Sequence, residues 1–121
     1  MAITAPDSIY RKERSYYLDL LETQVMRLRT DPRRHFHVAD QLKELSQLTP
    51  GYIQASLVVG DTVFHRVCCN LQPLFLNAIC SLVREHFDPV TGYQIADMLE
   101  AAVPAEVRNP YCPPATCHQV P

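Results

Sequence analysis

The chain has 121 residues, of which 47% are hydrophobic and 20% charged; these proportions are typical of one globular domain and exclude global disorder. The net charge of −2 argues against a general binder of nucleic acids or membrane surfaces. No apolar run approaches the roughly 18 residues that span a bilayer, and from the first residues we expect no signal peptide. With five cysteines present, we expect a nuclear or cytosolic protein with reduced thiols.

The charge is divided unevenly along the chain. Residues 1–37 contain seven Lys or Arg against five acidic residues, whereas residues 38–121 contain four against eight. The first part therefore carries +2 and the second −4. This mild asymmetry suits a protein partner better than a nucleic-acid duplex.

The first expected helix begins near residue 8 and carries one apolar stripe, formed by Leu18, Leu21, Val25 and Leu28. Its first turns contain Arg11, Lys12 and Arg14, although the dipole of a helix disfavours cations there. Either the regular helix begins nearer Ser15, or this basic turn contacts an acidic partner. We favour the later start, and Asp31-Pro32 should end the helix.

A second helix is expected over residues 33–47, and Thr49-Pro50 then reads as the start of a short third helix that ends at Gly60. A strand over 52–59 is the alternative to this short helix. The buried side chains expected on it are Tyr52, Ile53, Leu57 and Val58.

The longest apolar stripe of the chain follows Asp61, a candidate helix cap, and is interrupted by Pro73. We predict two helices here, over about 61–70 and 73–87, and a last helix over about 91–103 after Asp88-Pro89. The sequence thus predicts an all-α bundle of five or six helices over residues 1–103. An extended, Pro-rich tail over 104–121 follows it. The members of the stripe are Phe64, Val67, Cys68, Leu71, Leu74, Phe75, Ile79, Leu82, Val83 and Phe87.

Three side chains of the tail could ligate zinc: Cys112, Cys117 and His118. A structural zinc site needs four ligands, so we favour reduced tail thiols, with no metal and no cofactor. A disulfide between the two tail cysteines would need an oxidising compartment. The segment 33–37 combines basic residues with an aromatic and could contact phosphate, but solvated side chains at a helix start explain it equally well.

His65 lies three residues before Cys68, a spacing that nucleophilic catalysis on a helix could use. Cys68 falls in the middle of the core stripe, however, and His65 should point outward. A helix-turn-helix over 38–57 fails because Lys43 and Ser46 stand where that motif needs a small and an apolar residue. We therefore expect a protein that is not an enzyme.

The segment Leu42-x-x-Leu45-x-x-Leu48-Thr49-Pro50, followed by Val59-Gly60-x-x-Val63, resembles the TFIIS N-terminal (LW) domain family over about residues 15–87. The family's leucine-rich helix, leucine-threonine-proline turn and valine-glycine step have counterparts here. Its closing Leu-Val-x-x-Trp is replaced by Leu82-Val83-Arg84-Glu85-His86, and Asp61 stands where the family has lysine.

The resemblance implies a scaffold that docks short, disordered, acidic-aromatic motifs of partner proteins in transcription elongation. In the integrase-binding relatives of this family two neighbouring inter-helix loops make the contact, and they correspond here to residues 29–34 and 68–73. The partner-binding residues that it implies are Thr30, Asp31, Arg33, Cys69 and Leu71. Asp31 as a helix cap and Leu71 as a core residue are the structural alternatives.

Two other functions remain open. A self-associating adapter or chaperone-like protein, including a homodimer, would use the stripe within residues 15–30. A weak nucleic-acid adapter would use the basic side chains of Arg27, Arg29, Arg33 and Arg34, and its affinity would fall steeply with salt.

Overall fold

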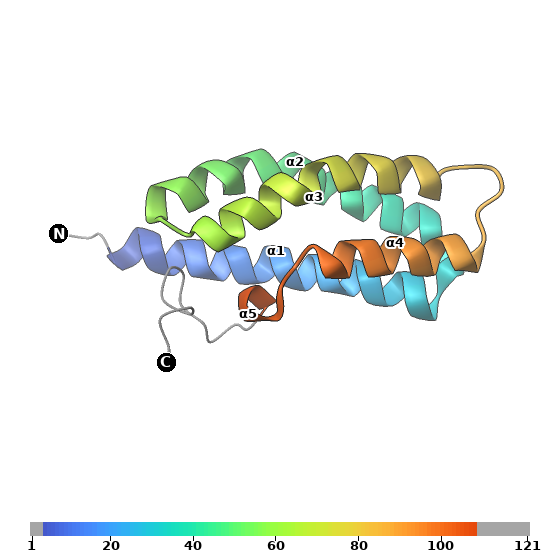
Figure 1. Ribbon diagram of the computed structural model, residues 1–121, viewed down its shortest axis with the longest axis horizontal. Coiled ribbons are helices and arrows are strands. Elements are labelled where there is room, and N and C mark those ends of the chain that lie inside the picture. Colours follow the sequence, from blue (N-terminus) through green and yellow to red (C-terminus); the bar gives the residue numbers. More distant parts are fainter. Residues whose placement is uncertain (1–3, 109–121) are drawn as a thin grey trace.

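The computed structural model describes residues 4–108, and within this range every regular element is a helix. The four long helices run up, down, up and down along the long axis of the molecule (Figure 1). The expected all-α bundle is therefore confirmed. The elements are α1 (Thr4–Thr30), the 3-10 turn η1 (Pro32–Arg34), α2 (His35–Val59), α3 (Thr62–Leu82), α4 (Pro89–Ala101) and the short α5 (Ala105–Arg108).

The two ends of the bundle hold different connections. The α1–α2 and α3–α4 connections lie together at one end, on the right of Figure 1, and the α2–α3 connection lies at the other. Among residues 4–108, no helix has the length and apolar character that crossing a membrane requires.

Several helix boundaries follow the sequence signals. Gly60 adopts φ 79°, the left-handed conformation that ends α2, and the Asp61 carboxylate accepts a hydrogen bond from the Phe64 amide at 3.3 Å. Asp88 accepts one from the Thr91 amide at 2.7 Å at the start of α4. The end of the first helix before Pro32 is confirmed as well.

The helix breaks predicted at two prolines are wrong. Pro50 lies inside α2 and Pro73 inside α3, so the turn at 48–50 and the break at 70–73 are absent. A proline in a helix interior costs about 3 kcal/mol relative to Ala. Both prolines are exposed, so neither ring takes up space in the core. Burying one Leu or Phe side chain contributes about 1.5–3 kcal/mol, so the buried residues on both sides of each proline outweigh this cost.

The unbroken α2 also changes which residues it buries. Thr49, Tyr52 and Ser56 continue the inward face that Leu42 and Leu45 begin. Consequently Leu57 and Val58, which were expected to be buried, are exposed, while Ile53 is half-buried.

The start predicted for the first helix near Ser15 is wrong, and the alternative of an acidic partner is correct for Arg14. The helix begins at Thr4, and both Tyr10 and Arg14 are buried. Each donates a 2.8 Å hydrogen bond to the Asp61 carboxylate. Because the helix begins ten residues earlier, Arg14 lies well beyond the first turn, where the helix dipole would disfavour a cation.

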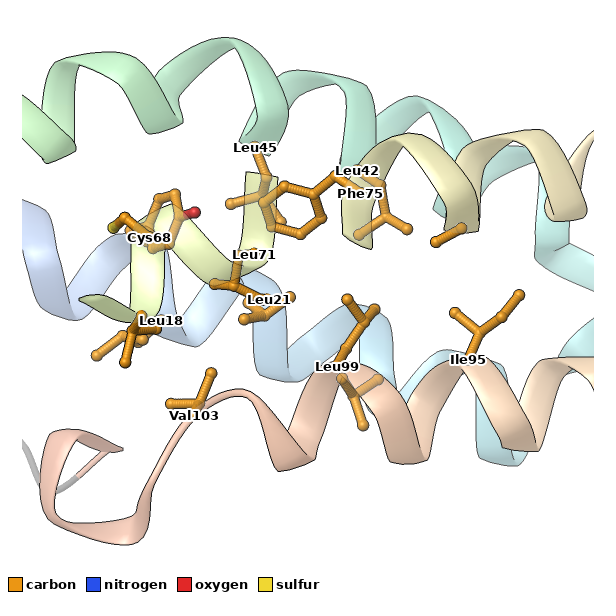
Figure 2. Packing of buried hydrophobic residues seen from close by; sticks show 14 of the residues in the cluster. Leu18, Leu21, Leu42, Leu45, Cys68, Leu71, Phe75, Ile95, Leu99 and Val103 are labelled. Atoms are coloured by element: carbon orange, nitrogen blue, oxygen red, sulfur yellow. The ribbon is translucent and has the colours of Figure 1, made fainter. Parts of the chain in front are cut away.

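All four long helices contribute to one continuous core, which Figure 2 shows around Leu21, Leu45, Leu71 and Leu99. Val103 and Val107, beyond the end of α4, are also buried in it. The extended conformation predicted from residue 104 is therefore wrong for α5, and residues 109–121 lie outside the described range.

Candidate docking surface at one end of the bundle

His35 joins the two helix connections that meet at one end of the bundle. Its ring Nδ1 lies 2.7 Å from the Leu82 carbonyl oxygen, which can only accept, so Nδ1 carries a proton and donates it. The ring stacks on Phe87, with centroids 4.4 Å apart and planes at 19°, and also touches Phe36 at 4.2 Å. The start of α2, the end of α3 and the α3–α4 connection are therefore fixed against one another.

Gly92 allows α4 to pack closely at the same end. A Cβ on this residue would lie 3.1 Å from Cζ of Phe87 and 3.4 Å from the Leu28 carbonyl oxygen. A larger side chain here would therefore press on Phe87, whose ring supports His35.

Exposed basic and apolar side chains lie around this fixed corner. The Arg33 side chain is 93% exposed, and Phe36 is 58% exposed. Arg34 and Val83 are also exposed. We call Arg33, Arg34, Phe36 and Val83 the corner surface.

Asp31 lies beside the corner surface and contacts both of its guanidinium groups. Its carboxylate oxygens are 3.4 Å from Nε of Arg33 and 3.4 Å from Nε of Arg34. Exposed ion pairs of this kind contribute about 0–1 kcal/mol, so a further carboxylate can compete for either guanidinium at little cost. The Asp31 side chain makes no cap hydrogen bond to η1, although its backbone occupies the N-cap position.

The neighbouring polar side chains of α1 have intramolecular partners. Arg29 donates to Asp97 at 2.7 Å and to Glu100 at 3.1 Å, which ties α1 to α4 and raises the pKa of its guanidinium, mostly through the hydrogen bond with Glu100. The Thr30 hydroxyl donates to the Met26 carbonyl. Thr30 therefore lies at the corner, but its hydroxyl proton is already used in a hydrogen bond within α1.

The structure does not bring the two predicted contact loops together. Thr30, Asp31 and Arg33 lie at the corner, but Cys69 and Leu71 lie within α3, about 20 Å and about 16 Å along the helix axis from its corner end. Leu71 is 0% exposed and lies between α3 and α1 (Figure 2), so it is a core residue. Its predicted role as a partner contact is wrong, and Cys69 is an exposed helix residue and not a loop residue.

Two residues of the corner surface were missed by the sequence analysis. Phe36 lies in the basic-aromatic segment 33–37, which indicated only a phosphate contact or a solvated helix start. Val83 was assigned to the apolar stripe of α3, but it is the C-cap residue of that helix and half of its surface is exposed.

The expected burial of Cys68 is confirmed, whereas His65, which was expected to point outward, is half-buried against α2. Cys68 is fully buried, and burial raises the pKa of its thiol to about 12, which keeps it protonated. The ring of His65 lies beside Cys69, with Nε2 3.7 Å from Sγ. Within residues 4–108 no three His, Cys, Asp or Glu side chains are grouped as metal ligands, and Cys112, Cys117 and His118 lie outside this range.

A cleft of about 310 Å³ separates the first half of α3 from the end of α4 and α5. It contains one basic and one acidic residue, Arg66 and Glu106, with Thr62 and Asn70 beside them. Because this lining contains both charges, it selects neither an anionic nor a cationic ligand. The corner surface is therefore the stronger candidate for a docking site.

No family model, no curated protein and no solved structure matches this chain. The resemblance to TFIIS N-terminal domains therefore stays a prediction. The leucine-threonine-proline turn on which it partly rests is absent, because Leu48, Thr49 and Pro50 are all helical within α2.

Proposed function

We propose that the protein is a non-enzymatic interaction module whose corner surface docks short acidic segments with an aromatic or aliphatic anchor. The observation that carries this proposal is the exposure of the Phe36 ring in the same short segment as the exposed guanidinium groups of Arg33 and Arg34. Phe36 and Val83 offer apolar area to an anchor side chain, while a guanidinium pairs with a carboxylate through two parallel hydrogen bonds. His35 holds this surface in place, so docking requires little ordering of the protein.

The partner class in this proposal is a disordered segment of a transcription-elongation protein. Its support is the resemblance of the α2–α3 sequence to TFIIS N-terminal domains, together with the excess of basic residues in the first 37 positions.

The two alternative functions receive less support from the side-chain positions. The stripe proposed for self-association is inside the bundle, where Leu18, Leu21, Val25 and Leu28 are buried. Of the four arginines proposed for nucleic acid, Arg29 binds Asp97 and Glu100, and Arg27 donates to Nε2 of His37 at 3.0 Å.

An NMR titration of the isotope-labelled chain with an acidic-aromatic peptide tests the proposal. We expect amide shifts concentrated in residues 31–37 and 82–87. The double variant Arg33→Glu/Arg34→Glu should weaken binding at least tenfold, about 1.4 kcal/mol. Lys43→Glu reverses a single exposed charge on α2 and serves as a control for charge reversal away from the corner, with unchanged affinity expected.

Shifts that avoid both segments, or equal effects of the two charge reversals, would contradict the corner surface as the docking site. Sedimentation of the unliganded chain adds a separate check, because a stable dimer would favour the self-associating adapter. Binding to a DNA or RNA duplex that weakens steeply with salt would favour the nucleic-acid adapter.

A further inference from the structure

Cys69 and His65 form a thiol–imidazole pair on the surface of α3. They are four residues apart, so both lie on the same side of the helix, and Cys69 Sγ is 3.7 Å from Nε2 of His65. Cys69 is exposed, whereas the ring of His65 is half-buried against α2. The imidazole is thus held between two helices while the thiol faces solvent.

The partners on the other side of the ring determine which nitrogen carries the proton. Nδ1 lies 3.2 Å from the carbonyl oxygen of Ile53, which can only accept a hydrogen bond. Nδ1 also lies 3.3 Å from Oγ of Ser56, and the single proton of that hydroxyl is directed to the Ile53 carbonyl at 2.9 Å. Both neighbours therefore accept from Nδ1, so Nδ1 is the protonated nitrogen of the neutral ring.

It follows that Nε2 carries a free lone pair and faces the Cys69 thiol as a hydrogen-bond acceptor. A nucleophile beside a base that a third group orients is the arrangement that activates thiols in proteins. The remaining described cysteines are natural comparators. Cys80 is exposed on the same helix, and Cys68 is buried with a raised thiol pKa.

We propose that Cys69 is a site of modification by small disulfides such as oxidised glutathione. The Cys69 thiol reacts by thiol–disulfide exchange, and His65 acts as the base. Nε2 takes the thiol proton as Sγ attacks one sulfur of the disulfide. A bond forms between Sγ and that sulfur, the original disulfide bond breaks, and the departing thiolate receives the proton from the imidazolium. Cys69 is oxidised and one glutathione sulfur is reduced, so the added disulfide is the only oxidant needed.

The rate of mixed-disulfide formation at each cysteine tests this proposal. The full chain is incubated with oxidised glutathione, quenched with acid and digested, and modification at each cysteine is assigned and quantified from fragment ions by tandem mass spectrometry. We expect Cys69 to react at least tenfold faster than Cys80, and Cys68 to remain unmodified. Equal rates at Cys69 and Cys80 would overturn the proposal.

The variant His65→Asn separates the base from the packing of the ring. The Asn amide nitrogen can take the place of Nδ1 as a donor to the Ile53 carbonyl, but no atom replaces Nε2. We expect the rate at Cys69 to fall to within about threefold of Cys80, and an unchanged ratio between the two would contradict the role of His65. Modification of Cys68 in this variant reports whether the bundle has opened.

A second measurement needs no variant. When the wild-type chain is unfolded in urea, the contact between Cys69 and His65 is lost, and the two rates should converge. A Cys69 to Cys80 ratio that persists in urea would mean that local sequence, and not the folded pair, sets the reactivity.

Discussion

Arg14 and Asp61 form a buried ion pair between residues 47 positions apart in the chain. Nη1 of Arg14 lies 2.8 Å from Oδ2 of Asp61, and the two side chains are only 6% and 4% exposed. Nη2 of Arg14 donates to the Val107 carbonyl at 3.1 Å, and the guanidinium lies over the Phe64 ring. The pair therefore connects α1, the α2–α3 connection and α5 at the end of the bundle opposite the corner surface.

Replacing Asp61 by Asn should destabilise the protein by about 3–5 kcal/mol, because it leaves the Arg14 charge buried without a counter-ion. Urea unfolding followed by circular dichroism measures the change. Asp40→Asn, at an exposed position of α2, is the matched control, with an expected effect within about 0.5 kcal/mol. A loss below 1 kcal/mol for Asp61→Asn would mean that the pair contributes little to the fold.

Stability should fall at alkaline pH because four buried acids hold their protons more tightly in the folded state. Burial is the largest cause in each case: it raises the thiol pKa of Cys68 to about 12 and the pKa values of the Tyr10, Tyr17 and Tyr52 hydroxyls above their ordinary range. A raised pKa stabilises the fold fully below the unfolded value, and this contribution is lost as pH rises toward the folded value. The loss should begin near pH 8.5, the ordinary pKa of cysteine, and steepen above about pH 10 as the tyrosines join.

Urea unfolding between pH 7.5 and 11 in a non-thiol reductant checks this prediction. Each such group contributes at most about 1.4 kcal/mol per pH unit. Cys68→Ala should remove the part of the slope between pH 8.5 and 10, and an identical slope in this variant would assign the loss to other groups.

Leu71→Ala should cost about 2–5 kcal/mol, as for other fully buried leucines. Leu76→Ala, on the exposed side of the same helix, should stay within about 0.5 kcal/mol. The midpoints of denaturant unfolding distinguish the two variants. If Leu71→Ala were as stable as Leu76→Ala, the position of Leu71 in the core would be wrong.

Pro73→Ala should stabilise the protein by about 1–2 kcal/mol. Alanine restores an amide donor to α3 and removes the cost of about 3 kcal/mol that proline has in a helix interior. The unfolded chain is more flexible without the proline, which stabilises the unfolded state by about 1 kcal/mol and offsets part of this gain. Thermal unfolding monitored by circular dichroism measures the difference. A destabilised variant would indicate that the proline ring itself makes contacts that the fold needs.

The sequence predicted the helical class and those boundaries that depend on local chemistry. Gly60, Asp61 and Asp88 end or begin helices through their own backbone or side-chain hydrogen bonds, which neighbouring residues suffice to specify. Pro50 and Pro73 were misinterpreted because their cost is offset by burial of residues that only the packed bundle brings together. The same holds for Arg14, whose partner lies on another element.

The candidate sites were predicted less well than the fold. Asp31 and Arg33 lie at the corner surface, but Leu71 was given to a loop because the helix was expected to end there. Only Cys68, three residues on, was considered as a partner of His65 and was rejected as a core residue, whereas the ring lies beside Cys69, four residues on. A shift of one residue on a helix rotates a side chain by about 100°, which is enough to exchange a buried thiol for an exposed one.

The continuity of α2 and α3 through their prolines has a consequence for how the chain folds. Neither helix can extend past its proline on local propensity, so an isolated peptide spanning 35–59 or 62–82 should be helical only in separate, weakly populated halves. The halves join when the two helices pack against each other and against α1. Helix formation and core formation are therefore a single cooperative event in this pair, and residual helix in the unfolded chain should stop at residues 50 and 73.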